Sequence, residues 1–89
     1  MAFYRVEFKP SAERELRRLP KAVIPKISRA IDSLVNNPFP HQCEKLSGST
    51  NAYRLRVGDY RVVYVVENRI LLVTIIRLGH RKDVYRRLS

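Results

Sequence analysis

Apolar and basic side chains alternate strictly along residues 53–57, whose sequence is Tyr-Arg-Leu-Arg-Val. A second run, residues 60–66, is rich in valine and tyrosine, which are residue types that favour β-strands. Gly58 and Asp59 separate the two runs and are typical of a two-residue hairpin turn. The pattern therefore predicts a β-hairpin over residues 53–66.

The turn also predicts the register of this hairpin. If Val57 pairs with Tyr60, then Arg56 lies opposite Arg61. Because side chains alternate between the two faces of a strand, Arg54 joins these arginines on one face. The other face is apolar and consists of Tyr53, Leu55, Val57, Tyr60, Val62 and Tyr64. Like charges directly opposite each other destabilise a sheet unless an anion neutralises them, so a phosphate-bearing partner is the simplest candidate.

The N-terminal half shows one alternating segment and two stretches of helical periodicity. Residues 3–8 predict a first strand, which Pro10 ends. Residues 10–19 predict a short helix with proline in its first turn, and the apolar positions of residues 23–35 predict a second helix. Residues 39–50 are rich in Pro, Gly and Ser and predict a loop that leads into the hairpin.

The segment after the hairpin predicts one more strand. Residues 67–69 form a turn, and residues 70–76 are apolar on both faces, which is typical of a central strand. Gly79 is expected to end this strand, and residues 80–89 form either a short basic helix or a loose tail. The order β-α-α-β-β-β predicts a single α+β domain over residues 1–89. Its helical hairpin covers one face of a mostly antiparallel sheet, in which a three-stranded meander follows the helices, and leaves the other face for function.

Charge narrows the class of partner. The 89 residues include 18 Lys and Arg against 8 Asp and Glu, which gives a formal net charge of +10. An anionic partner is therefore expected, and both nucleic acid and an acidic protein qualify. A membrane surface would require a basic amphipathic helix with aromatic anchors, and none is evident in the sequence.

Cysteine and histidine content bear on compartment and cofactors. Cys43 is the single cysteine, which excludes an internal disulfide and suits a reducing cytoplasm. The longest apolar run is too short to span a bilayer and the N-terminus lacks a signal-peptide core, so we expect a soluble cytoplasmic protein. Two distant histidines and one cysteine lack the spacing of zinc ligands, so no metal or other cofactor is expected.

The order of the strands brings a second group of side chains towards the arginines. If the last strand runs antiparallel to the strand before it, the residues after Gly79 emerge close to Arg61. We therefore expect His80, Arg81 and Tyr85 to join the arginine cluster. The result would be an open basic surface with a histidine and a tyrosine in reach.

Several segments together point to a known family. They are residues 3–8, the Lys-Leu-Ser-Gly of residues 45–48, the hairpin core of residues 53–64 and the closing residues 79–85. Over almost its whole length the chain resembles the RelE-like toxins of bacterial and archaeal toxin–antitoxin modules. The resemblance implies the RelE-like microbial RNase fold and an endoribonuclease that enters the ribosomal A site and cuts mRNA there without a metal. It also implies a small RelB-like antitoxin that wraps the toxin, and contact with operator DNA only through the toxin–antitoxin complex.

The family's functional positions carry over where its motifs match. The two basic residues before the turn match Arg54 and Arg56, and the arginine at the head of the next strand matches Arg61. The arginine after the closing glycine matches Arg81, and the tyrosine four residues later matches Tyr85. In the best-known members the first two positions are lysines, whereas arginines do not deprotonate in proteins, so a lysine general-base role does not carry over.

Other relatives suggest a different acid–base pair. They use a glutamate before the hairpin and a histidine near the C-terminus, positions that match Glu44 and His80. His80 is the candidate general acid, because an imidazole exchanges protons readily near neutral pH. Glu44 is the candidate base, although a solvated or structural role in a polar loop is the competing interpretation. Tyr85 is expected to stack on a base or orient the 2′-hydroxyl.

The chemistry of metal-free cleavage assigns the remaining roles. RNA is cut when its own 2′-hydroxyl attacks the adjacent phosphorus, which requires a base, an acid and cations for the charge on phosphorus. Planar guanidinium groups suit the last task, so we assign Arg61 and Arg81 to the scissile phosphate. The basic residues expected to position the RNA backbone are Arg54, Arg56, Lys45 and Lys82.

Two other classes of function remain open at this point. One is a ParE-like toxin of the same superfamily, which poisons DNA gyrase instead of cutting RNA. The other is a module without enzymatic activity, whose basic face binds only an acidic antitoxin or an operator complex. Replacing Arg61 or Arg81 with alanine distinguishes these classes, since only the nuclease needs both side chains for toxicity.

Overall fold

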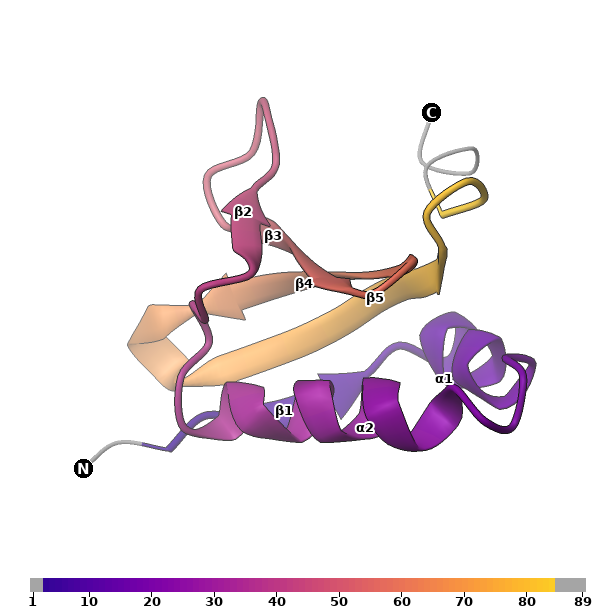
Figure 1. Ribbon diagram of the computed structural model, residues 1–89. Coiled ribbons are helices and arrows are strands. Elements are labelled where there is room, and N and C mark those ends of the chain that lie inside the picture. The colour runs from indigo at the N-terminus through magenta and orange to yellow at the C-terminus, as the bar shows by residue number, and fades with distance from the viewer. Residues whose placement is uncertain (1–2, 85–89) are drawn as a thin grey trace.

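The structure is a computed structural model, and it describes residues 3–84. Its elements in chain order are β1 (Arg5–Phe8), α1 (Pro10–Arg17), α2 (Ile24–Asp32), a 3₁₀ helix (Ser33–Val35), β2 (Cys43–Lys45), β3 (Ala52–Val57), β4 (Tyr60–Glu67), a second 3₁₀ helix (Asn68–Ile70) and β5 (Leu72–His80). Figure 1 shows both helices on one side of a twisted sheet. The predicted α+β class, with a helical hairpin on one face, is confirmed.

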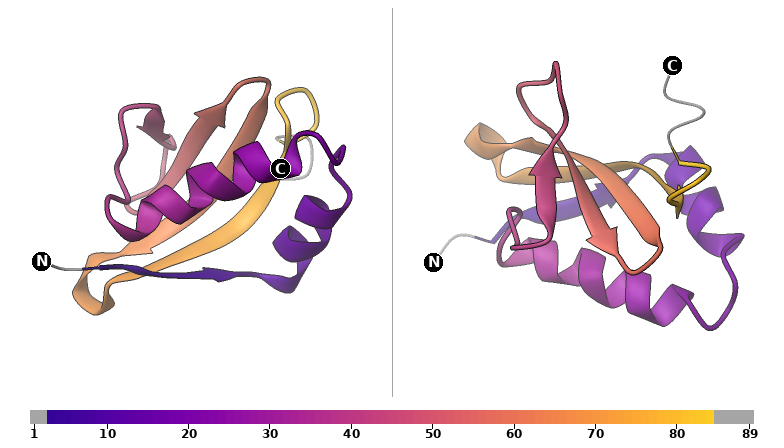
Figure 2. Two further views of the ribbon diagram at one scale, coloured as in Figure 1. Left: turned by 60° about the horizontal axis from the view of Figure 1, so that its bottom comes forward. Right: turned by 45° about the horizontal axis from the view of Figure 1, so that its top comes forward.

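The sheet has five strands in the order β1-β5-β4-β3-β2. β1 pairs with β5 in parallel, and the other neighbouring pairs are antiparallel. β5 therefore lies inside the sheet, as its apolar residues predict. Figure 2 shows α2 lying across the strands, with α1 near the C-terminal end of β5.

Each helix has a proline in its first turn, Pro10 in α1 and Pro25 in α2, where the missing N–H costs nothing. In α1, Glu13 lies in the first turn and Arg17 in the last, so both charges complement the helix dipole. α1 ends at Arg17, two residues before the predicted end at residue 19. In α2, Ile27 and Ile31 lie one turn apart and face the sheet, which explains why the helical pattern of this segment was readable from the sequence.

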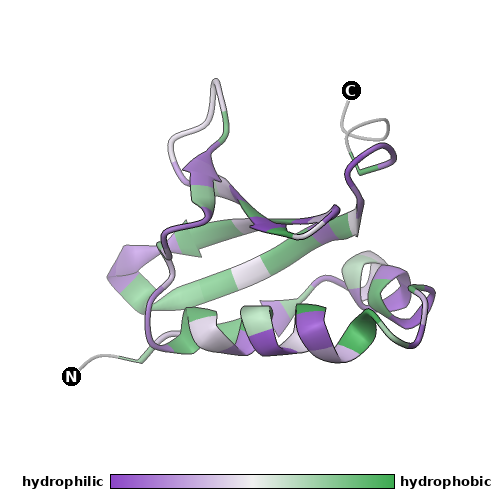
Figure 3. Ribbon diagram, viewed as in Figure 1, coloured by the Kyte–Doolittle hydropathy of each residue, from purple (hydrophilic) through white to green (hydrophobic). Residues whose placement is uncertain are grey.

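The hydrophobic core lies between the helices and the sheet. Ile27 from α2 is fully buried, as are Tyr64 from β4 and Ile75 from β5. Figure 3 shows hydrophobic residues concentrated along β4 and β5. Burial raises the pKa of the Tyr64 hydroxyl, which stays protonated and donates a hydrogen bond of 2.8 Å to the carbonyl of Pro38. Tyr53 and Tyr60 pack against this core, as predicted.

The segment of residues 39–50 differs from its prediction as a loop, because Cys43–Lys45 form the edge strand β2. Cys43 lies opposite Leu55, Glu44 opposite Arg54 and Lys45 opposite Tyr53. Three residues are too few for an alternating pattern to show in the sequence. Pairing with the preformed edge of β3, rather than local strand propensity, makes this strand.

The last strand also differs from its prediction. Residues 68–70 form a 3₁₀ helix and Leu71 adopts a left-handed φ of 53°, so β5 begins only at Leu72. Gly79 was expected to end this strand. Instead Gly79 pairs with Arg61 of β4, and β5 continues to His80. The first strand begins at Arg5 and not at residue 3.

The segment after β5 is described only in part. Residues 81–84 form a turn, with the Asp83 and Val84 amides donating to the carbonyl of His80 at 2.8 and 3.0 Å. The choice between a C-terminal helix and a loose tail falls largely on residues 85–89, which lie outside the described residues. Within residues 3–84, no helix has the length and apolar character needed to cross a membrane.

Candidate functional site

The face of the sheet opposite the helices carries basic side chains in two adjacent rows. In one row, Arg56 of β3 lies opposite Arg61 of β4, which in turn lies opposite Gly79 of β5. In the other row, Arg54 of β3 lies opposite Glu44 of β2. The rows are two residues apart along the strands, or ~6.6 Å. We call this surface, with Arg54, Arg56, Arg61 and Glu44, the arginine face, and its hairpin register is the predicted one.

Arg61 leans towards the turn between β3 and β4. Its Nη1 atom donates hydrogen bonds of 3.0 Å to the carbonyl of Gly58 and 2.9 Å to the carbonyl of Tyr60. These carbonyl oxygens offset part of the repulsion between Arg61 and Arg56, which face each other across the ladder. The Nε and Nη2 atoms of Arg61 have no such contact within residues 3–84 and can receive an anion.

Arg81 reaches the same turn from the end of β5. Its amide donates a 2.8 Å hydrogen bond to the carbonyl of Asp59, and its Nε lies 3.7 Å from Oδ1 of the same residue. Figure 1 shows the end of β5 beside the turn between β3 and β4. The structure thus brings Arg81 to Arg61, as the antiparallel pairing of β4 and β5 predicts.

Glu44 places a carboxylate on the arginine face. Its Oε2 lies 3.1 Å from Nη2 of Arg54, and both side chains are exposed, by 70% and 39% respectively. An ion pair this exposed contributes little to stability. Glu44 belongs to β2 and not to the loop in which it was expected, so its position on the face is set by the pairing with β3.

His80 does not join the arginines, and this is a correction to the expected arrangement. His80 lies opposite Tyr60, whereas its neighbour Gly79 lies opposite Arg61, so alternation directs its side chain to the helix-covered face. The rings of Tyr60 and His80 lie edge to face, with centroids 5.5 Å apart. Nδ1 of His80 accepts a 3.1 Å hydrogen bond from the amide of Lys82.

The remaining predicted RNA-binding residues lie away from the centre of the face. Lys45 lies opposite Tyr53, so alternation turns it away from the arginines. Lys82 lies in the turn that follows β5, next to Arg81. Tyr85 lies outside the described residues.

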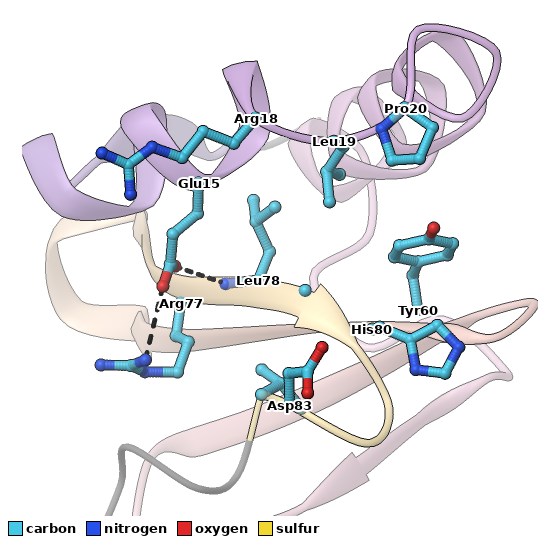
Figure 4. A pocket seen from close by; sticks show the side chains of 11 residues that line it. Glu15, Arg18, Leu19, Pro20, Tyr60, Arg77, Leu78, His80 and Asp83 are labelled. Atoms are coloured by element: carbon cyan, nitrogen blue, oxygen red, sulfur yellow. Dashed lines mark hydrogen bonds and ion pairs between the residues drawn. The ribbon is translucent and has the colours of Figure 1, made fainter.

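A cavity of about 330 Å³ lies beside the C-terminal end of β5, between α1 and the turn that follows the strand. His80 and Tyr60 line one side of it, and Figure 4 shows them facing Leu19 and Pro20. On its other side, Oε1 of Glu15 accepts a 3.0 Å hydrogen bond from the amide of Leu78. The Leu78 amide thereby gains an acceptor that β1 does not supply, since β1 pairs with β5 only as far as Ile75.

Glu15 also binds the neighbouring arginine. Its Oε2 lies 3.4 Å from Nη1 of Arg77, and both side chains are largely buried, with 18% and 20% exposed. Figure 4 shows Glu15 between Arg77 and Leu78. The carboxylate therefore holds α1 against the strand that delivers Arg81 to the turn.

A second hollow, of about 470 Å³, lies between α2 and β3. Leu55 and Val57 form its apolar floor, and Lys26 and Arg29 of α2 add positive charge. This hollow adjoins the same end of the hairpin, because Nζ of Lys26 lies 3.3 Å from the position that a Cβ on Gly58 would occupy. Positive charge therefore surrounds the turn from both faces of the sheet.

Sequence reasoning missed the contacts of Asp59, Glu15 and Lys26. Asp59 was interpreted only as a turn residue, although an acid beside arginine-rich strands was a usable signal. Glu15 lies 62 residues from Arg77, and Lys26 meets the turn only through the packing of α2, so no local pattern reveals either contact.

The arrangement suits the binding of an anion by fixed cations. Arg61 and Arg81 converge on one turn, and Glu44 supplies a carboxylate on the adjacent row. Guanidinium groups can hold two oxygens of one phosphate, and a nearby carboxylate can accept a proton. Among residues 3–84, no group of three or more His, Cys, Asp and Glu side chains lies close enough to hold a metal ion.

Comparison with known proteins identifies one family. Residues 6–85 match the family model described as "ParE toxin of type II toxin-antitoxin system, parDE". The putative toxin RelE1 of Methanocaldococcus jannaschii is 31% identical over 88 residues, which cover 93% of this chain and 96% of the relative. Toxin RelG of Mycobacterium tuberculosis is 34% identical over 89 residues, which cover 94% of this chain and 98% of the relative.

Solved structures agree with this assignment. One chain in the crystal structure of the archaeal RelE-RelB complex from Pyrococcus horikoshii OT3 superposes with a TM-score of 0.80 and is 32% identical. The match covers 92% of this chain and 99% of that chain. The family model carries the ParE name, whereas these relatives carry the RelE name.

Proposed function

The chain belongs to the ParE toxin family of type II toxin–antitoxin systems and is a RelE-like toxin of such a module, and from this premise we propose that it cuts mRNA in the ribosomal A site. The observation that carries the proposal is the convergence of Arg61 and Arg81 on one turn at the edge of the arginine face. Two guanidinium groups beside one turn can together bind a single phosphate.

The proposed reaction is attack of a ribose 2′-hydroxyl on the adjacent phosphorus. The P–O5′ bond breaks, leaving a 2′,3′-cyclic phosphate on one fragment. The leaving 5′-oxygen takes a proton from water and becomes the 5′-hydroxyl of the other fragment. Negative charge builds on the phosphoryl oxygens during this step, and Arg61 and Arg81 stabilise it. Removing a preorganised donor of this kind typically costs ~10²- to 10³-fold in rate.

Glu44 is the proposed general base. Its carboxylate lies on the arginine face, and its ion pair with Arg54 at 3.1 Å orients it. A base must accept the proton of the attacking hydroxyl, and the second carboxylate oxygen of Glu44 is available for that contact. Arg54 and Arg56 bind the RNA backbone on either side of the cut, with Lys45 and Lys82 at the margins.

His80 is a weaker candidate for the general acid than its residue type indicates. Its ring lies beside Tyr60 on the helix-covered face, so it does not face a phosphate held by Arg61. We propose that charge stabilisation by the arginines supplies most of the rate. Tyr85 keeps its proposed role of stacking on an mRNA base.

A RelB-like antitoxin is the proposed protein partner. RelE and RelB form complexes among the solved relatives, and the one from Pyrococcus horikoshii OT3 matches 92% of this chain. A formal net charge of +10 favours an acidic antitoxin. Contact with operator DNA is proposed only through that complex.

The test is to add the purified protein to ribosomes stalled on a defined mRNA with an empty A site and to map the new 5′ ends. We expect a cut within the A-site codon only when ribosomes are present. A parallel assay measures supercoiling by DNA gyrase. Intact mRNA together with inhibited gyrase would replace the proposal with the ParE-like activity, and intact mRNA with active gyrase would favour a binding module.

A further inference from the structure

The turn between β3 and β4 accepts hydrogen bonds from two arginines, from the side chain of Arg61 and from the backbone amide of Arg81. The carbonyls of Gly58 and Tyr60 accept from the Arg61 side chain at 3.0 and 2.9 Å. The carbonyl of Asp59 accepts from the Arg81 amide at 2.8 Å, and its carboxylate lies 3.7 Å from Nε of Arg81. Arg61 of β4 and Arg81, the first residue after β5, are therefore both held by one turn.

Cations crowd this turn and would repel one another without an anion. Arg56 lies opposite Arg61 in the ladder, and the amino group of Lys26 approaches Gly58 from α2. Arg81 has a long side chain that is 54% exposed, so repulsion alone would direct it into solvent. The Asp59 carboxylate is the group that opposes this effect.

We propose that Asp59 is a positioning residue, whose carboxylate holds the guanidinium of Arg81 beside Arg61 before RNA arrives. The inference rests on the proposed function, because Arg81 must need a defined position for phosphate chemistry. The contact with Asp59 is through Nε of Arg81, at 3.7 Å, so the guanidinium still has donors to offer a phosphate. The Arg81 side chain then loses its conformational entropy when the free protein folds, and this loss does not add to the barrier of the cleavage step.

Stability does not explain this contact. The carboxylate of Asp59 is 71% exposed, and an ion pair between two exposed side chains contributes little to folding. The backbone hydrogen bond from Arg81 to Asp59 already joins the two segments without the carboxylate. A carboxylate beside a phosphate site also repels RNA, so its presence is a cost to binding.

These opposing effects predict a distinctive pattern for Asp59→Asn. Asparagine suits a turn and leaves the backbone bond to Arg81 in place. The variant lacks one negative charge, so it should bind the ribosome–mRNA complex as tightly as the wild type or up to a few-fold more tightly. Arg81 loses its orienting partner, so the single-turnover cleavage rate at saturating ribosomes should fall ~10- to 100-fold.

Asp32→Asn is the matched control, because Asp32 is exposed at the end of α2 and the substitution changes the net charge equally. It should leave the cleavage rate unchanged. Asp59→Glu keeps the charge and should restore part of the rate. A thermal unfolding curve for each variant shows whether a lost rate reflects lost structure.

An activity-independent measurement separates this inference from the proposed function. The ¹⁵N relaxation of the Arg81 Nε–H group in the free protein should show greater mobility in Asp59→Asn than in the wild type, and Asp32→Asn should match the wild type. If the wild type cuts no mRNA, the proposed function fails, and the relaxation data still decide whether Asp59 orders Arg81. Equal cleavage rates for wild type and Asp59→Asn, or equal mobility of Arg81, would overturn the inference.

Discussion

At the scale of single residues, the site depends on which face of a strand each side chain occupies. Arg61 and Tyr60 are neighbours in the chain, yet Arg61 belongs to the arginine face and Tyr60 packs against the core. The same alternation separates Gly79 from His80 on β5. The identity of a residue indicates the chemistry it can perform, but its register decides whether it can reach the substrate.

Glu44→Gln tests the carboxylate on the arginine face. The amide keeps the size of the side chain and can still contact Arg54, but it cannot accept the proton of a 2′-hydroxyl. The cleavage rate should fall by ~10²-fold or more, which is the usual contribution of a general base. Single-turnover cleavage of ribosome-bound mRNA measures this effect.

Thermal unfolding provides the control for Glu44→Gln. The ion pair with Arg54 is exposed, so its loss should change the free energy of unfolding by less than ~1 kcal/mol. An unchanged cleavage rate in a folded variant would remove Glu44 from the mechanism.

His80→Gln tests the correction made by the structure. Glutamine retains a hydrogen-bonding side chain but cannot act as an acid near neutral pH. Because the imidazole lies beside Tyr60 and away from Arg61, the rate at neutral pH should fall by less than ~10-fold, below the usual range for loss of a general acid. A loss of ~10³-fold would show that the ring reaches the leaving oxygen on the ribosome.

At the scale of elements, the Glu15 carboxylate of α1 binds the end of β5 at positions where β1 does not pair with it. Glu15 accepts from the amide of Leu78 at 3.0 Å and pairs with Arg77 at 3.4 Å. Nε of Arg77 is buried without a hydrogen-bond partner among residues 3–84, so this arginine depends on its contact with Glu15. The packing of α1 on β5 therefore supports the position of Arg81 from a distance.

Glu15→Ala should destabilise the fold. The change leaves the Leu78 amide and the Arg77 guanidinium without their acceptor in a largely buried setting, which costs ~2 to 4 kcal/mol. Glu13→Ala on the same helix is the matched control, because Glu13 forms an exposed i,i+4 pair with Arg17 and should cost under ~1 kcal/mol. Urea unfolding of the two variants measures the difference, and equal midpoints would contradict this account.

The elements also show how far sequence reasoning reaches. The hairpin and α2 were predictable because alternation and helical spacing are local signals, and a Gly-Asp turn sets a register. The three residues of β2 become a strand only by pairing with β3, so nothing local identifies them. Gly79 was misjudged as a strand end, because a glycine in the sequence does not show whether a ladder continues through it.

For the site, the sequence predicted the shared face of Arg54, Arg56 and Arg61 from strand periodicity alone. The position of Arg81 followed from the antiparallel pairing of β4 and β5. The prediction that His80 lies on the arginine face was wrong. The face of this side chain depends on the register at the very end of β5 and on the contact with Tyr60. The roles assigned to these residues remain predictions.

At the scale of the whole molecule, the fold separates stability from function. The helices cover one face of the sheet and build the core, and the arginine face lies on the other side. A net charge of +10 on a small chain opposes compactness through self-repulsion and attracts an anionic partner. The extent of the domain, residues 1–89, stays a prediction.

The central claim is that Arg61 and Arg81 stabilise the charge on a scissile phosphate. The most direct measurement is the single-turnover rate of A-site mRNA cleavage by Arg61→Ala and Arg81→Ala, with Arg5→Ala as a control that removes an equal charge from the edge strand β1. Each of the first two variants should lose ~10²- to 10³-fold in rate while it remains folded and able to bind the antitoxin, and Arg5→Ala should keep the wild-type rate. Wild-type rates in both folded variants, or equal losses in all three, would contradict the account.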